Sequence, residues 1–128
     1  MRKLVVATLA VTIAAPAYAD EVNIYSYRQP ELLQPLLDAF TEETGVTTNV
    51  AFVEKGLVER LKAEGRRSPA DIILTTDISR LTEAKEAGVT QAVDSDILDT
   101  AIPAALRDTD DQWFGLTTRA RIIYASRD

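Results

Sequence analysis

Cysteine and histidine are both absent from the 128 residues of this sequence. Without cysteine there is no disulfide framework, no thiol nucleophile and no thiolate metal site. Without histidine the chain lacks the commonest general base, the usual partner of a catalytic serine and the commonest zinc ligand. No nucleophile motif, metal-ligand cluster or phosphate-binding glycine loop compensates for these absences. They argue against an enzyme.

Long apolar runs are also missing, except at the start of the chain. Two basic residues (2–3) precede an apolar run (4–15) and a small-residue site at residues 17–19. This order is typical of a secretory signal peptide, and the run is shorter than the ~20 residues that span a bilayer. An uncleaved anchor or a buried apolar strand is the alternative interpretation. We expect cleavage after Ala19, export to the periplasm and a mature chain that begins at Asp20.

Positive charge is in the minority. The whole sequence has 14 basic and 20 acidic residues, and removal of residues 1–19 leaves 12 basic against 20 acidic, a net charge of about −8. An acidic chain without a clustered basic face is not expected to bind nucleic acid or an anionic lipid surface.

The mature sequence alternates predicted strands with predicted helices. Stretches rich in β-branched and apolar residues predict strands, and apolar residues at helical spacing predict helices between them. The strands are expected at residues 22–25, 46–53 and 71–74, and the helices from Pro30 to Gly45, through Leu57, Val58 and Leu61 to near Gly65, and from the cap Asp77 to Gly88. Three strand–helix pairs in succession predict an α/β fold, with a mainly parallel sheet and helices on both faces.

Two polar loops follow the first and third predicted strands, at residues 26–29 and 75–77. In parallel sheets ligands gather beyond the carboxyl ends of the strands, so these loops are the expected binding edge. The acidic stretch 94–111 is interpreted as a surface helix and loop with a solvated face. Residues 113–118 and 121–124 are expected to be extended, and because the sequence stops after them we expect a truncated product or a fragment.

Several motifs resemble those of a known family. They are VNIYSYRQP at residues 22–30, SPAD at 68–71 and DDQWFGLTTRAR at 110–121. With the signal peptide, they resemble the periplasmic ferric-iron-binding proteins of bacterial ABC importers, within the class II periplasmic solute-binding fold. The resemblance runs from Asp20 to Asp128. Family members are more than twice as long and have two lobes, so the chain resembles the N-terminal lobe with the second lobe absent.

The resemblance implies that the full-length protein binds Fe³⁺ with carbonate or another synergistic anion and delivers it, as a monomer, to a permease in the inner membrane. Fe³⁺ prefers anionic oxygen donors, and the family's tyrosine ligands would lie beyond Asp128. Where some relatives have a histidine or a histidine–tyrosine pair, this chain has Gln29 and Pro30. Where some relatives have a glutamate, it has Thr76. No metal ligand is therefore assigned within the chain, as in the subgroup whose first lobe holds only the anion.

Arg119 is the residue we expect to hold that anion, because a planar guanidinium donates two parallel hydrogen bonds to carbonate. Further candidates come from the two polar loops: Arg28, Tyr27, Gln29, Thr76 and Asp77. Each candidate also has a purely structural interpretation. Asp77 caps a helix in that interpretation, and Arg119 forms an inter-strand salt bridge.

Other functions remain open at this point. The same fold binds organic anions, polyamines or vitamins in related proteins, because fold does not fix function. A periplasmic hydrolase and the sensory domain of a receptor are weaker alternatives. A fragment with no function of its own is a further one, since half a cleft without its tyrosines is expected to bind iron weakly.

Overall fold

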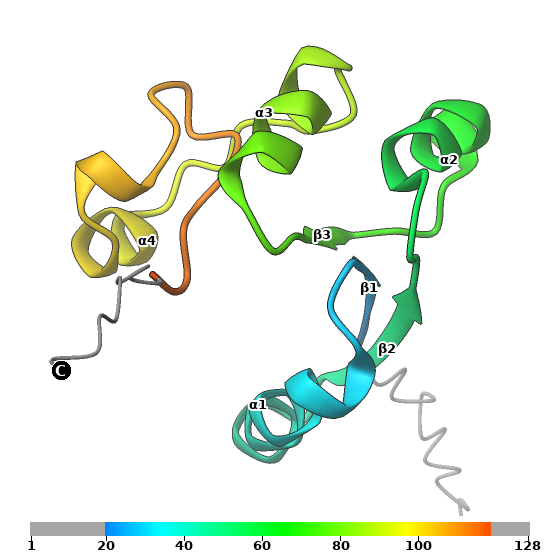
Figure 1. Cartoon of the computed structure of the whole chain (residues 1–128). Coiled ribbons are helices and arrows are strands. Elements are labelled where there is room, and N and C mark those ends of the chain that lie inside the picture. Colours follow the sequence, from blue (N-terminus) through cyan, green and yellow to red (C-terminus); the bar gives the residue numbers. More distant parts are fainter. Residues whose placement is uncertain (1–19, 119–128) are drawn as a thin grey trace, which may run out of the picture.

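The computed structural model describes residues 20–118 of the chain. Three strands, β1 (Glu21–Ser26), β2 (Thr47–Phe52) and β3 (Ile72–Leu74), form one sheet in the order β2-β1-β3 (Figure 1). Both pairings are parallel, and Tyr25 of β1 lies opposite Ala51 and Ile73. The predicted parallel α/β arrangement is confirmed. The predicted signal peptide, Arg119 and the second extended segment lie outside the described residues.

Four α-helices are found within residues 20–118, and the first three begin and end close to the predicted residues, while the fourth lies in the stretch expected to hold a surface helix and loop. They are α1 (Pro30–Thr44), α2 (Leu57–Glu64), α3 (Ile78–Glu86) and α4 (Asp96–Ala101), with short 3₁₀ turns η1 (Gly65–Arg67) and η2 (Ala104–Leu106). Pro30 occupies the first turn of α1, where its missing N–H costs no hydrogen bond. Gly45 ends the same helix with a φ of 74°, a left-handed conformation that favours glycine.

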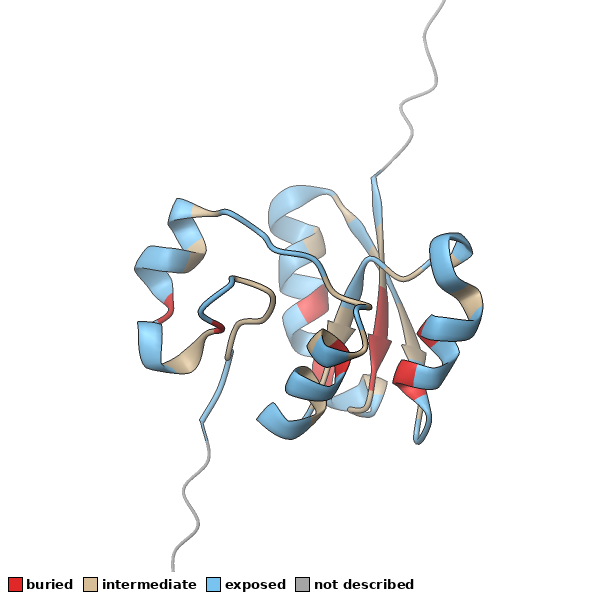
Figure 2. Ribbon diagram, turned by 90° about the horizontal axis from the view of Figure 1, so that it is seen from above, coloured by how far each residue is buried: buried red, intermediate tan, exposed pale blue. Residues whose placement is uncertain are grey.

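Helices lie on both faces of the sheet, as predicted. On one face, Ile24 packs with Leu33 and Leu37 of α1. On the other, Tyr25 packs with Leu57 and Leu61 of α2. Neighbouring residues of β1 serve opposite faces because side chains alternate along a strand. Figure 2 shows the buried residues on the strands and on the helix surfaces turned toward them.

The apolar residues of α1 divide into a buried set and an exposed set. Leu33 and Leu37 are buried, whereas Leu32, Leu36 and Phe40 are 62%, 63% and 40% exposed. Residues four apart share a helix face, so the exposed three form a stripe beside the buried pair. The apolar spacing that predicts the helix therefore does not by itself distinguish its core side.

The segment after α3 lies beside that helix rather than on the sheet (Figure 1). Nζ of Lys85 donates to both carboxylate oxygens of Asp108, at 2.8 Å each, and to Asp110 at 2.7 Å. Asp108 is only 9% exposed and also accepts the backbone N–H groups of Asp110 and Gln112. The interpretation of the whole acidic stretch as a solvated face is therefore wrong at Asp108, because a lysine distant in sequence pairs with it.

Residues 113–118 form less structure than the sequence predicted. The only pairing in this segment is an isolated antiparallel bridge between Phe114 and Arg107. None of the helices between residues 20 and 118 has the length and apolar character that crossing a bilayer requires.

Candidate functional site

The loops that follow β1, β2 and β3 meet at the carboxyl edge of the sheet. The Tyr27 N–H donates to the Leu74 carbonyl at 3.0 Å, which joins the ends of β1 and β3. The Val53 N–H donates to the Ser26 carbonyl at 2.9 Å, which joins the ends of β1 and β2. The two polar loops that the sequence singled out therefore lie side by side. We call residues 26–29, 53–56 and 75–77 the ligand edge.

Ser26 fixes the conformation of the first loop, a role that sequence reasoning missed. The residue is completely buried, and its Oγ accepts the Arg28 N–H at 2.9 Å and donates to the Arg28 carbonyl at 2.8 Å. A small hydroxyl residue directly after an apolar strand is the signal that could have revealed this turn. The hydrogen bonds of Ser26 hold the backbone on which Arg28 and Gln29 are mounted. Gln29 is exposed, and its side chain makes no capping bond to α1.

Tyr27 links the first loop to α2 and α3. Its hydroxyl oxygen accepts the Leu57 N–H at 3.2 Å, at the start of α2. The Arg80 guanidinium of α3 lies over its ring, with the central carbon 3.9 Å from the ring centroid. The first contact satisfies one of the N–H groups that a helix leaves unpaired at its start, and the second is a cation–π interaction. Tyr27 is therefore firmly held, while its role toward a ligand stays a prediction.

The third loop is held by hydrogen bonds among its own residues. Thr75 Oγ1 donates to the Asp77 carbonyl at 3.0 Å, and Asp77 Oδ1 accepts the Arg80 N–H at 3.0 Å. The helix-capping role considered for Asp77 is confirmed. Thr76 is exposed, and its hydroxyl lies 3.4 Å from Asp77 Oδ2. Thr76 and Asp77 are thus both exposed in this loop, and Asp77 is the one engaged in capping α3.

The ligand edge thus brings together five of the six candidates: Tyr27, Arg28, Gln29, Thr76 and Asp77. The sixth, Arg119, lies outside the described residues. Within residues 20–118, no three acidic side chains are grouped closely enough to hold a metal ion. The edge carries two cations, Arg28 and Lys55, two acids, Glu54 and Asp77, and the polar side chains of Gln29 and Thr76. Its cations and hydrogen-bond donors are the groups that could bind an anion.

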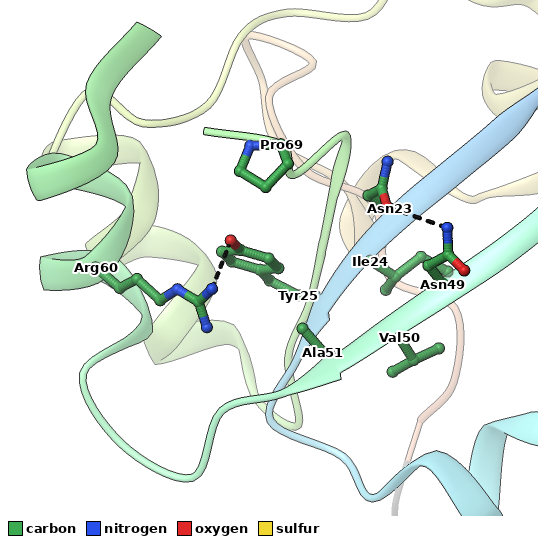
Figure 3. Close-up of a pocket in the computed structure, with 8 residues that line it drawn as sticks. All are labelled: Asn23, Ile24, Tyr25, Asn49, Val50, Ala51, Arg60 and Pro69. Atoms are coloured by element: carbon green, nitrogen blue, oxygen red, sulfur yellow. Dashed lines mark hydrogen bonds between the residues drawn. The ribbon is translucent and has the colours of Figure 1, made fainter. Parts of the chain in front are cut away.

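A second polar cluster lies behind the sheet, around the hydroxyl of Tyr25 (Figure 3). Tyr25 is 3% exposed, and its oxygen accepts from Arg60 Nη2 at 2.8 Å and donates to Glu64 at 3.0 Å. Ser68 Oγ donates to Glu64 at 2.6 Å. Burial, followed by the bond to Glu64, raises the pKa of Tyr25, whereas the bonds from Ser68 and Arg60 lower the pKa of Glu64. The cluster ties α2 to β1.

A cavity of about 250 Å³ borders this cluster and is visible in Figure 3. Asn49 donates to Asn23 at 3.3 Å along its wall. These two residues pair with each other three positions before the strands end, and none of the residues that line the cavity belongs to the ligand edge. Arg60 and Glu64 satisfy each other at 2.8 Å, which leaves the cluster without an unpaired charge for a ligand.

An α/β unit with converging polar loops at the carboxyl edge of a parallel sheet has its polar groups where such sheets bind ligands. No family model matches the chain. Iron uptake protein A1 of Synechocystis is 45% identical over 109 residues, which cover 84% of this chain and 30% of that protein. A solved structure of ferric iron-binding protein A from Mannheimia haemolytica, in an open conformation, matches this chain with a TM-score of 0.75 and 55% identity. The match covers 77% of this chain and 31% of the Mannheimia chain.

Two further comparisons concern the ligand and the compartment. A Trichodesmium protein solved with iron and citrate ligands matches this chain with a TM-score of 0.70 and 44% identity. The match covers 74% of this chain and 30% of the Trichodesmium chain. A Serratia marcescens relative, 27% identical over 86% of this chain and 33% of its own length, is named a periplasmic Fe(3+)-binding protein.

The chain is therefore homologous to bacterial iron-uptake and ferric iron-binding proteins, and it spans about a third of the length of the relatives it matches. These relatives are iron-binding and iron-uptake proteins, and not enzymes.

Proposed function

We propose that residues 20–128 form the first lobe of the solute-binding component of an iron(III) ABC importer. In this proposal residues 1–19 are the signal peptide, and the lobe works in the periplasm. The lobe supplies the anion side of a ferric site whose tyrosine ligands come from a second lobe. The protein then delivers Fe³⁺ to a permease in the inner membrane.

The observation that carries the proposal is the ligand edge itself. Its loops present Arg28, Gln29 and Thr76 on a hydrogen-bonded frame, at the position where parallel sheets bind ligands. Fe³⁺ prefers anionic oxygen ligands, and within residues 20–118 no group of three such side chains is close enough to hold the ion by itself. We infer that this lobe contributes to the ferric site by binding and neutralising an anion, which in turn completes the coordination shell of the metal. Arg119 is proposed as the principal contact with carbonate, since its guanidinium matches two carboxylate-type oxygens.

A chimera tests the proposal directly. Residues 20–128 would replace the corresponding segment of the Mannheimia protein, so that the rest of the chimera comes from a protein named for ferric iron binding. Titration with ferric iron and bicarbonate is expected to give a visible tyrosinate-to-iron charge-transfer band, because the proposed second lobe supplies tyrosine ligands. A folded chimera with no band and no retained iron would refute the proposal.

The same chimera tests Arg119. The substitution Arg119→Gln is expected to weaken iron retention by about tenfold or more, because it removes the charged, two-pronged donor. Arg119→Lys keeps the charge and separates geometry from charge. If both variants retain iron like the unsubstituted chimera, the assignment of Arg119 is wrong.

One alternative retains support from a specific observation. Because no group of three metal-ligating side chains lies within residues 20–118 and Arg28 is mounted on the hydrogen-bonded first loop, a small organic anion is the second candidate ligand. Titration of the chimera with an organic anion, in the presence and in the absence of iron, distinguishes the two candidate ligands. An organic anion that binds the chimera equally well with and without iron would favour this alternative.

A further inference from the structure

Arg80 stands out among the cations near the ligand edge because its position is fixed. Its guanidinium lies 3.9 Å from the centroid of the Tyr27 ring. That ring is itself fixed, since the Tyr27 hydroxyl accepts the Leu57 N–H. A cation stacked on an anchored ring loses little further freedom when it binds a ligand, and such pre-organisation favours affinity. Most exposed arginines lack this advantage.

The one acidic partner of Arg80 in the described part of the chain is weakly engaged. Nε of Arg80 lies 3.4 Å from Asp77 Oδ2, and both side chains are more than a third exposed, at 39% and 48%. The other oxygen of Asp77 is occupied by the Arg80 backbone N–H at 3.0 Å. Exposed ion pairs of this kind contribute little. Across residues 20–118, no hydrogen bond from the two terminal nitrogens of Arg80 is found.

Arg80 contacts residues of two of the three loops of the ligand edge, Tyr27 of the first and Asp77 of the third. It lies in the first turn of α3, directly after the third loop of the edge, and it contacts Tyr27 of the first loop. Leu57, which bonds to Tyr27, follows the second loop. A guanidinium at this junction can donate two parallel hydrogen bonds to a carboxylate while its flat face stays on the ring.

We propose that Arg80, beside the ligand edge, is an anion-binding residue that holds two oxygens of a small anion such as citrate or carbonate. The Tyr27 ring serves as its platform. This inference uses the proposed function only to name the kind of anion that reaches the edge. It concerns a residue that the sequence did not suggest, and it predicts binding of the anion in the absence of iron.

Citrate alone is the first probe, and bicarbonate alone is the second. Each would be titrated at low ionic strength into the ¹⁵N-labelled chain lacking residues 1–19, with iron excluded by a chelating resin. Amide chemical shifts and calorimetry report binding. Citrate is expected to shift the amides of Tyr27, Asp77 and Arg80 together. Low salt is needed because exposed charge interactions are screened.

Three variants make the test specific. Arg80→Gln is expected to weaken citrate binding at least tenfold, and Arg80→Lys several-fold, because lysine keeps the charge but lacks the planar fork. Tyr27→Leu is expected to weaken it also, by removing the platform. The matched control is Arg66→Gln in η1, which removes one exposed arginine after the far end of α2 and is expected to leave affinity unchanged.

The assignment would be overturned if the unsubstituted chain binds neither anion. Equal losses in the Arg80→Gln and Arg66→Gln variants would also overturn it, because they would indicate only an effect of net charge. Retention of the native amide spectrum identifies folded variants, and Arg80→Lys covers the case in which glutamine disturbs α3. Iron binding by the chimera is measured separately, so failure of either proposal is recognised independently of the other.

Discussion

Leu57 provides the most quantitative test of the packing that builds the ligand edge. It is fully buried, begins α2 and packs with Tyr25 and Leu61 against the sheet. Its backbone N–H also bonds to Tyr27, so the residue connects the core with the edge. Replacement by alanine removes the equivalent of about three methylene groups, or ~2.4 kcal/mol of transfer free energy at ~0.8 kcal/mol each. The cavity left behind raises the expected loss to about 3 kcal/mol.

Leu36→Ala is the matched control, because it makes the same chemical deletion on the exposed stripe of α1. Leu36 is 63% exposed, so its replacement is expected to change the free energy of unfolding by less than ~0.5 kcal/mol. Urea denaturation followed by circular dichroism would measure both variants. At ~4–8 °C per kcal/mol, the melting temperature of the Leu57→Ala variant should fall by more than ~10 °C. A loss below ~1 kcal/mol, or equal losses in the two variants, would refute the arrangement of α1 and α2 described above.

Three further predictions concern charge, backbone conformation and export. The hydrogen bond from Lys85 lowers the pKa of Asp108, so the pair stabilises the fold above about pH 4 and loses this contribution as the pH falls through the lowered pKa. The substitution Asp108→Asn should therefore flatten the acid side of a plot of melting temperature against pH. An unchanged plot would contradict the pairing. Gly45→Ala should lower the free energy of unfolding, measured by urea titration, by about 1 kcal/mol, because the φ of 74° at residue 45 is unfavourable for alanine. A stabilised variant would argue against that backbone conformation. Mass spectrometry of the exported protein should find Asp20 as the first residue, and Ala19→Arg should leave the precursor uncleaved.

Much of the fold could be predicted from local sequence. Pro30 and Gly45 delimit α1 because one lacks an N–H that the first turn does not need and the other tolerates a positive φ. Asp77 caps α3 through a bond within four residues. The run of three short apolar strands separated by helices predicts parallel pairing. These features are determined by neighbouring residues, and the structure confirms them.

The candidate site was predicted only in outline. The two polar loops were expected at one edge, and the bonds from Tyr27 to Leu74 and from Val53 to Ser26 place them there. Arg80 was missed because its significance depends on Tyr27, which belongs to another loop. Likewise, Asp108 looked like part of a solvated acidic stretch until Lys85 of α3 was found beside it. In both cases the signal is a contact between residues far apart in the chain.

The sequence by itself determined the α/β order, the limits of the helices, the acidic charge and the absence of cysteine and histidine. Motifs within it also led to the iron-binding family. Tertiary structure alone decided which face of α1 is buried, that Tyr25 and Ser26 are enclosed, and that Arg80 rests on Tyr27 at the ligand edge. The physical reason is that propensity, capping and composition act over a few residues, whereas burial and the pairing of charges depend on which distant segments the fold brings into contact.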